Sequence, residues 1–73
     1  MNALDLAREL AGLDERIAAA DERLTRQREE VDRLAGAGAD TSAASARVGD
    51  TTRALAAMRS RRRTILQKIN VPL

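Results

Sequence analysis

Three pairs of adjacent acidic residues recur every seven or eight positions in the first half of the chain: Asp14-Glu15, Asp21-Glu22 and Glu29-Glu30. Carboxylates on one helical face could ligate a metal ion or act as a general acid and base. The chain has no His, Cys or Tyr, and carboxylate di-metal bundles normally also use histidines. Heptad patterning of an exposed face gives the same recurrence. We therefore expect no enzyme activity, no metal site and no cofactor.

Basic residues are concentrated in the second half. Residues 1–35 carry six basic and nine acidic side chains, whereas residues 41–73 carry seven basic and one acidic. Arginines at this density could neutralise phosphates or bind an acidic protein, although no aromatic residue is present to stack on bases. Alternatively, they solvate the helix and pair with acids of the first helix or of a partner subunit. The candidate contacts to an anionic partner are Arg47, Arg59, Arg61, Arg63 and Lys68.

Two runs of residues with a strict 4-3 spacing would position these side chains. Such spacing is the a/d seam of a coiled coil, which keeps one stripe facing a partner helix. The seam residues are Leu6, Leu10, Leu13, Ile17, Ala20, Leu24, Gln27, Val31 and Leu34, then Thr41, Ala44, Val48, Thr51, Leu55, Met58, Arg62, Ile65 and Ile69. We predict an all-α fold, a two-helix antiparallel coiled-coil hairpin, as a single domain over 1–73. Its helices span 3–35 and 41–70, and a glycine-rich turn spans 36–40.

Local signals support these boundaries. Asn2 is a candidate N-cap for the first helix. Gly36 and Gly38 tolerate the left-handed conformation that ends a helix, and Asp40-Thr41-Ser42 offers three candidate caps for the second. Pro72 disfavours helical geometry at the residue before it.

The two seams match if the numbers of opposing residues sum to 75. This register pairs Leu10 with Ile65, Ile17 with Met58, Ala20 with Leu55, Leu24 with Thr51 and Val31 with Ala44. Along the flanks it brings Glu9 near Lys68, Glu30 near Arg47 and Asp14 near Arg59, and it places Arg16 near Arg61. We expect each pair of opposite charge to contribute a few tenths of a kcal/mol if exposed.

Two polar residues interrupt the seam. Arg62 faces Leu13, and Gln27 faces Val48. Arg62 can lay its methylenes along the seam and place its guanidinium in water near Asp14 or Glu9. A polar seam residue can also select the register or the partner, and this second interpretation stays open.

A single hairpin seam buries few large side chains, so we expect self-association. Several apolar residues outside the seam collect on one flank near the open end of the hairpin: Leu4, Ala7, Ala11, Leu66 and Leu73. Ala18 and Ala56 continue this flank with small side chains. The sequence thus predicts a homodimer of hairpins that forms a four-helix bundle.

Three motifs carry a resemblance to a known group of proteins. Residues 16–34 contain "RIA…RLxRQRxxVxRL", residues 38–41 read "GxDT", and residues 54–66 read "ALxxMRxxRxxIL". In these motifs the chain resembles short bacterial helical-hairpin proteins that have no assigned activity. The resemblance implies a helical hairpin and suggests that the polar residue Gln27 is a family trait.

The N-terminal residues carry acids where a signal peptide needs a basic start, and no later run approaches membrane-spanning length. We therefore expect a complete cytoplasmic protein that does not engage membranes. The sequence favours a non-catalytic protein-interaction and oligomerisation module, a regulatory or adaptor protein with an unidentified protein partner. The alternatives are a basic-helix protein with weak, non-specific affinity for nucleic acid, and a small phage- or mobile-element-encoded inhibitor of a host complex.

Overall fold

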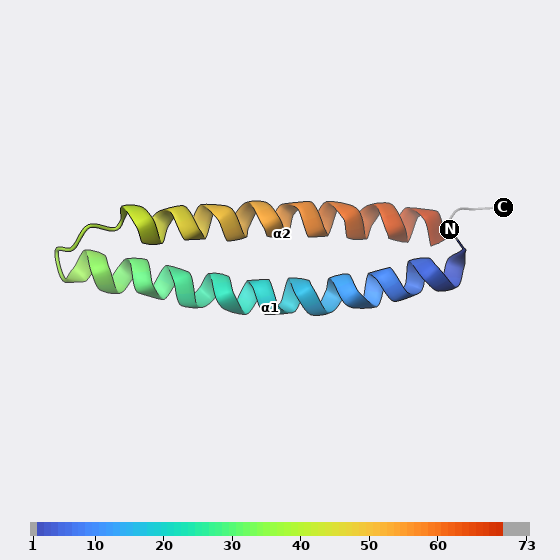
Figure 1. Cartoon of the computed structure of the whole chain (residues 1–73), viewed down its shortest axis with the longest axis horizontal. Coiled ribbons are helices and arrows are strands. Elements are labelled where there is room, and N and C mark those ends of the chain that lie inside the picture. Colours follow the sequence, from blue (N-terminus) through green and yellow to red (C-terminus); the bar gives the residue numbers. More distant parts are fainter. Residues whose placement is uncertain (1, 70–73) are drawn as a thin grey trace.

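The computed structural model describes residues 2–69, which form two long helices and no strand. Helix α1 spans Ala3–Gly36 and helix α2 spans Ser42–Ile69. The helices lie side by side and run in opposite directions, so the described ends of the chain meet at one end of a hairpin measuring 58 × 16 × 15 Å (Figure 1). The predicted all-helical hairpin is confirmed. In the described residues, neither helix is long and apolar enough to cross a membrane.

Helix α1 begins as the sequence predicts. Asn2 has an extended backbone, and its side-chain Oδ1 accepts a hydrogen bond of 2.9 Å from the Asp5 N–H. This bond satisfies one of the N–H groups that the first turn of a helix leaves without a partner. The Asp5 carboxylate also lies near the positive end of the helix dipole.

The end of α1 is a Schellman motif. The Gly38 N–H donates to the Ala35 carbonyl (3.1 Å), and the Ala39 N–H donates to the Leu34 carbonyl (2.9 Å). Gly38 has a φ of 69°, the left-handed conformation that glycine adopts at little cost. Gly36 remains helical, so α1 ends one residue later than the expected boundary at 35.

Helix α2 begins at Ser42, one residue after the expected start at 41. The Thr41 carbonyl accepts the first helical hydrogen bond, from the Ser45 N–H at 2.8 Å. The Asp40 carboxylate accepts the Ser42 N–H at 2.9 Å, and this bond to the ionised form lowers the pKa of Asp40. The expected end of this helix, at residue 70, lies outside the described residues.

The core occupies the predicted seam. Every buried side chain among residues 2–69 is a seam residue: Leu6, Leu13, Ala20, Leu24, Ala44, Thr51, Leu55 and Ile65. Leu55 and Ile65 are the most completely buried, with exposed fractions of 1% and 0%. Each contributes roughly 1.5 to 3 kcal/mol of hydrophobic stabilisation. Ile69, the last described seam residue, is 38% exposed.

The buried residues form two clusters along the hairpin. The cluster nearer the open end contains Leu6, Leu13 and Ile65, with Leu10 and Met58 packed against it. The second contains Ala20, Leu24 and Leu55, with Ile17, Val48 and Met58 packed against it. Met58 contacts both and so joins them. These neighbours agree with a register in which opposing residue numbers sum to 75.

Candidate interaction surface

Three arginines of the segment 59–63, which we call the basic cluster, form ion pairs with acids of α1. The pairs are Arg61 with Glu9, Arg62 with Asp14, and Arg59 with Asp21. Arginine reaches far from its helix and presents several donors to a carboxylate. These guanidinium groups therefore connect α1 to α2 along both flanks of the seam.

The pair between Arg61 and Glu9 is the least exposed of the three. Arg61 Nε and Nη2 donate to the two carboxylate oxygens of Glu9, at 2.5 and 2.8 Å. These hydrogen bonds are the main reason that the pKa of Glu9 is lowered; partial burial opposes the shift, and the charges of Arg61, Lys68 and Arg16 add to it. The same contact raises the pKa of Arg61.

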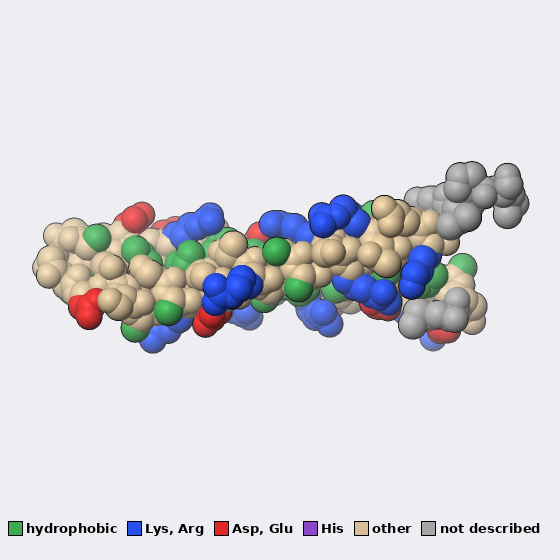
Figure 2. Space-filling model, turned by 90° about the horizontal axis from the view of Figure 1, so that it is seen from above, with side chains coloured by type: hydrophobic (Ala, Val, Ile, Leu, Met, Phe, Trp, Pro, Cys, Tyr) green, Lys and Arg blue, Asp and Glu red, His purple; other side chains and the backbone are tan. Residues whose placement is uncertain are grey.

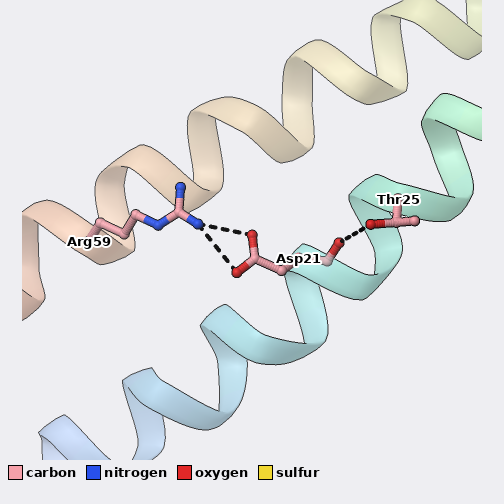
Figure 3. Close-up of polar contacts among 3 residues, drawn as sticks. All are labelled: Asp21, Thr25 and Arg59. Atoms are coloured by element: carbon pink, nitrogen blue, oxygen red, sulfur yellow. Dashed lines mark hydrogen bonds and ion pairs between the residues drawn. The ribbon is translucent and has the colours of Figure 1, made fainter.

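Arg59 and Asp21 form a second bridge, shown in Figure 3. Arg59 Nη2 donates to both carboxylate oxygens of Asp21, at 2.9 and 3.2 Å. The Thr25 hydroxyl donates to the Asp21 main-chain carbonyl one turn along α1 (Figure 3). Both side chains of the ion pair are about half exposed, so its contribution to stability is at most about 1 kcal/mol.

In two of the expected neighbouring pairs, the acid forms its ion pair with a different arginine, although the expected residue lies near it. Asp14 pairs with Arg62, and not with Arg59. Glu30 pairs with Arg33 of its own helix, and not with Arg47. In each case an arginine already close to the carboxylate offers a short charge-assisted hydrogen bond.

In a third expected pair, Lys68 lies near Glu9 but does not form an ion pair with it. Arg61 takes both oxygens of Glu9, and Lys68 acts on it only through its charge. Arg61 therefore forms an ion pair with an acid, and it lines a small hollow together with Arg16, as the register predicts. For the seam arginine Arg62, the expectation is confirmed: its Nε donates to Asp14 Oδ1 at 2.7 Å.

The other candidate anion contacts stay on the surface. Arg47, Arg63 and Lys68 are exposed and form no ion pair with another described residue. Figure 2 looks down on α2 and shows basic side chains distributed along most of the hairpin as far as its open end, and none at the tip of the turn. The candidate contacts therefore divide into two that are bound to α1, Arg59 and Arg61, and three that are available to a partner.

The predicted self-association surface lies near the open end. Leu4 is 59% exposed, Ala7 and Ala11 are exposed, and Leu66 is half-buried. Leu73, the fifth residue predicted for this surface, lies outside the described residues. We call Leu4, Ala7, Ala11 and Leu66 the apolar flank.

Two open hollows follow the same side of the hairpin. One of about 390 Å³ is lined by Asp14, Ile17, Arg59, Arg62 and Arg63. One of about 260 Å³, nearer the turn, is lined by Arg28, Val31, Asp32, Ser45 and Val48. Each is formed by side chains of both helices, so the groove between α1 and α2 is incompletely filled on this side.

Gln27 also lies at the seam, where it is half-buried. Its Oε1 is completely buried and has no hydrogen-bond partner among the described residues. The residues opposite it are small or β-branched, such as Ala44, Val48 and Thr51, and they offer no side-chain donor that reaches this oxygen. The 4-3 spacing predicted the position of Gln27, and the lack of a partner emerged only from the packing.

The acidic pairs of α1 divide between arginine contacts and the exposed face of the helix. Within residues 2–69 there is no group of three or more His, Cys, Asp or Glu side chains close enough to hold a metal ion. In the pairs Asp14-Glu15, Asp21-Glu22 and Glu29-Glu30, one member each contacts an arginine: Asp14, Asp21 and Glu30. The other member is exposed on the outer face of the helix.

Comparison with protein families, with characterised proteins and with solved structures gave no match to this chain.

Proposed function

We propose that this chain is a non-catalytic oligomerisation and protein-interaction module, which associates with itself and serves as a regulatory or adaptor protein. The observation that carries the proposal is the location of its apolar side chains. All buried side chains of the described part belong to one seam, whereas Leu4 and the other residues of the apolar flank remain accessible.

The shape of the hairpin supports association. The chain exposes 5258 Å², whereas a compact monomer of 7.9 kDa would expose ~4400 Å². A two-helix rod thus leaves more surface in water than its mass requires. Covering one side of the rod with a second hairpin would produce a four-helix bundle, in which small residues permit close approach of the helices.

The ion pairs favour a protein partner over a nucleic acid. Arg59, Arg61 and Arg62 use their guanidinium groups on acids of α1, which reduces the charge available to phosphates. A nucleic acid would have to compete with these carboxylates, and the chain has no aromatic side chain for stacking.

Sedimentation equilibrium tests the proposal. At tens of micromolar we expect twice the chain mass for the natural sequence. Leu66→Glu should shift the equilibrium to monomer, because it places a charge in the proposed contact. Ala46→Glu, on the outer face of α2, is the matched control and should leave the dimer intact. A fully helical monomer of the natural sequence at this concentration would contradict the proposal.

A further inference from the structure

We propose that the second copy of this chain binds the apolar flank in one defined orientation, with the two-fold axis along the hairpin and both open ends at the same end of the bundle. Each α1 then packs against the α2 of its partner. This inference rests on the proposed self-association and specifies its geometry.

The charges of the helices favour this arrangement. Residues 1–35, which contain most of α1, carry nine acidic and six basic side chains, and residues 41–73 carry one acidic and seven basic. A two-fold axis along the hairpin places α1 on the partner's α2, so that opposite charges meet. A two-fold axis across the hairpin would stack α2 on the partner's α2 and bring the basic helices together, which costs free energy.

On the side of the hairpin that carries the apolar flank, the side chains of one copy would meet complementary side chains of the other copy at the same level along the long axis. Positions seven apart share a face in a coiled coil, so Asp14 follows Ala7 on the flank, and Arg63 follows Ala56. In the register of the hairpin, Arg63 is level with the segment between Ala11 and Asp14. The level of Leu66 lies between Ala7 and Ala11.

One pair of charged residues is suited to join the copies. Arg63 has no ion pair within the described residues, and it lines the hollow of about 390 Å³ together with Asp14. Asp14 accepts one hydrogen bond, from Arg62 to its Oδ1. Its other carboxylate oxygen can therefore accept a guanidinium N–H of the partner's Arg63, and the two-fold axis makes this contact twice.

The remaining contacts on this face suit two closely packed helices. The apolar flank of one copy meets that of the other, with Leu66 against Ala7 and Ala11 of α1 in the partner. Ala18 and Ala56 come level with each other and permit close approach. A face of a rod measuring 58 × 16 × 15 Å is large enough for the ~800 Å² per partner of a standard interface.

Charge reversal tests the contact between Arg63 and Asp14. Arg63→Glu places two acids opposite each other, and we expect the dissociation constant of the dimer to rise about tenfold or more in sedimentation equilibrium. Arg47→Glu makes the same change of charge on the opposite flank of α2 and should leave the constant within about threefold. Equal weakening by the two variants would overturn the inference, and circular dichroism checks that both remain helical.

Disulfide formation tests the orientation independently. The described chain contains no cysteine, so two single-cysteine variants can be mixed and oxidised, and only a bond between copies can form. We expect Ala11→Cys and Leu66→Cys to crosslink efficiently, and Ala11→Cys and Asp32→Cys not to crosslink, because a disulfide requires Cα atoms within about 7 Å. Crosslinking through the second pair only would show a dimer whose two-fold axis lies across the hairpin, with the open ends at opposite ends. That result would overturn this inference, while the proposed self-association would stand. A monomeric natural sequence would overturn both.

Discussion

Gln27 shows how one polar atom can weaken an otherwise apolar seam. Its Oε1 is buried without a hydrogen-bond partner in the described part of the chain, and such a group loses its bonds to water without replacement. A residue of this kind lowers stability, and in coiled coils it can specify the register or the oligomeric state.

Replacing this residue with an apolar one should stabilise the hairpin. We expect Gln27→Leu to raise the free energy of unfolding by about 1 to 3 kcal/mol, because it removes the unpaired oxygen and fills the seam. Urea denaturation at a fixed protein concentration measures the effect. Gln67→Leu, at an exposed position of α2, is the control and should change stability by less than about 0.5 kcal/mol. A loss of stability in Gln27→Leu would show that the amide is satisfied in solution.

Glu9 should make the hairpin sensitive to acid. Hydrogen bonding to Arg61 lowers the pKa of Glu9 below its ordinary value of 4.5, so the ionised form is favoured in the folded state. A group whose pKa is lower when folded stabilises the fold above its unfolded pKa, and this contribution disappears as the pH falls through the folded pKa. We expect the melting temperature to decrease below about pH 4.5.

Glu9→Gln tests this assignment. The variant lacks the titrating carboxyl, so it should melt at a lower temperature than the natural sequence at pH 7. The melting temperatures of the two proteins should converge in acid. Thermal melts followed by circular dichroism from pH 7 down to pH 2 measure both. Glu15→Gln, at an exposed position of α1 without a described ion pair, should follow the natural sequence at every pH. If the melting temperatures of Glu9→Gln and the natural sequence differed by the same amount at every pH, the role given to the Arg61 contact would be contradicted.

At the scale of the elements, the two helices have different charge and depend on each other for compensation. Helix α2 carries the basic cluster, and α1 supplies Glu9, Asp14 and Asp21 as partners for three of its arginines. The pairing explains how a helix with several adjacent arginines can pack along another helix. It also leaves Arg47, Arg63 and Lys68 as the basic groups of α2 most available to ligands.

We therefore predict that α2 gives at most weak binding to nucleic acid, without sequence preference. Such binding arises from phosphate neutralisation and should decrease steeply as the salt concentration rises. Fluorescence anisotropy with two labelled duplexes of unrelated sequence measures it, before and after replacement of Arg47, Arg63 and Lys68 by Ala. Tight binding to one of the two duplexes at physiological salt would contradict the prediction and favour a nucleic-acid function.

At the scale of the whole molecule, one seam holds the helices together, and its register determines which side chains share a layer. Leu10 packs with the cluster around Ile65, and Leu55 belongs to the other cluster. Cysteines at Leu10 and Ile65 should therefore form a disulfide within one chain under mild oxidation. Cysteines at Leu10 and Leu55 should not, because the register separates them by about ten residues, or ~15 Å, along the helix.

Mass measurement of the oxidised products under denaturing conditions distinguishes the outcomes. A crosslinked single chain for the first pair and a reduced chain for the second would support the register. Crosslinks that occur only between chains would show that the helices of one molecule do not fold back on each other. A domain-swapped or continuous-helix assembly, with Gly38 helical, would then replace the hairpin.

Much of the architecture could be predicted from the sequence, because it depends on repeated or local features. The 4-3 spacing identified every residue that is buried in the described structure, since burial follows the face of a helix. Asn2 and Gly38 act at the helix ends as expected, because their cap and left-handed conformation involve only a few neighbouring residues. The positions of the apolar flank follow from the same periodicity.

Which charged groups pair depends on how the two helices pack together. The register placed Asp14 near Arg59 and Glu9 near Lys68. Long basic side chains can reach several acids, however, and the ion pair that forms is the one with the shortest bidentate or charge-assisted hydrogen bonds. The 4-3 spacing placed Gln27 in the seam, but whether its oxygen finds a partner depends on how the surrounding side chains pack. Periodicity determines the face on which a side chain lies, whereas the packed neighbours determine what it contacts.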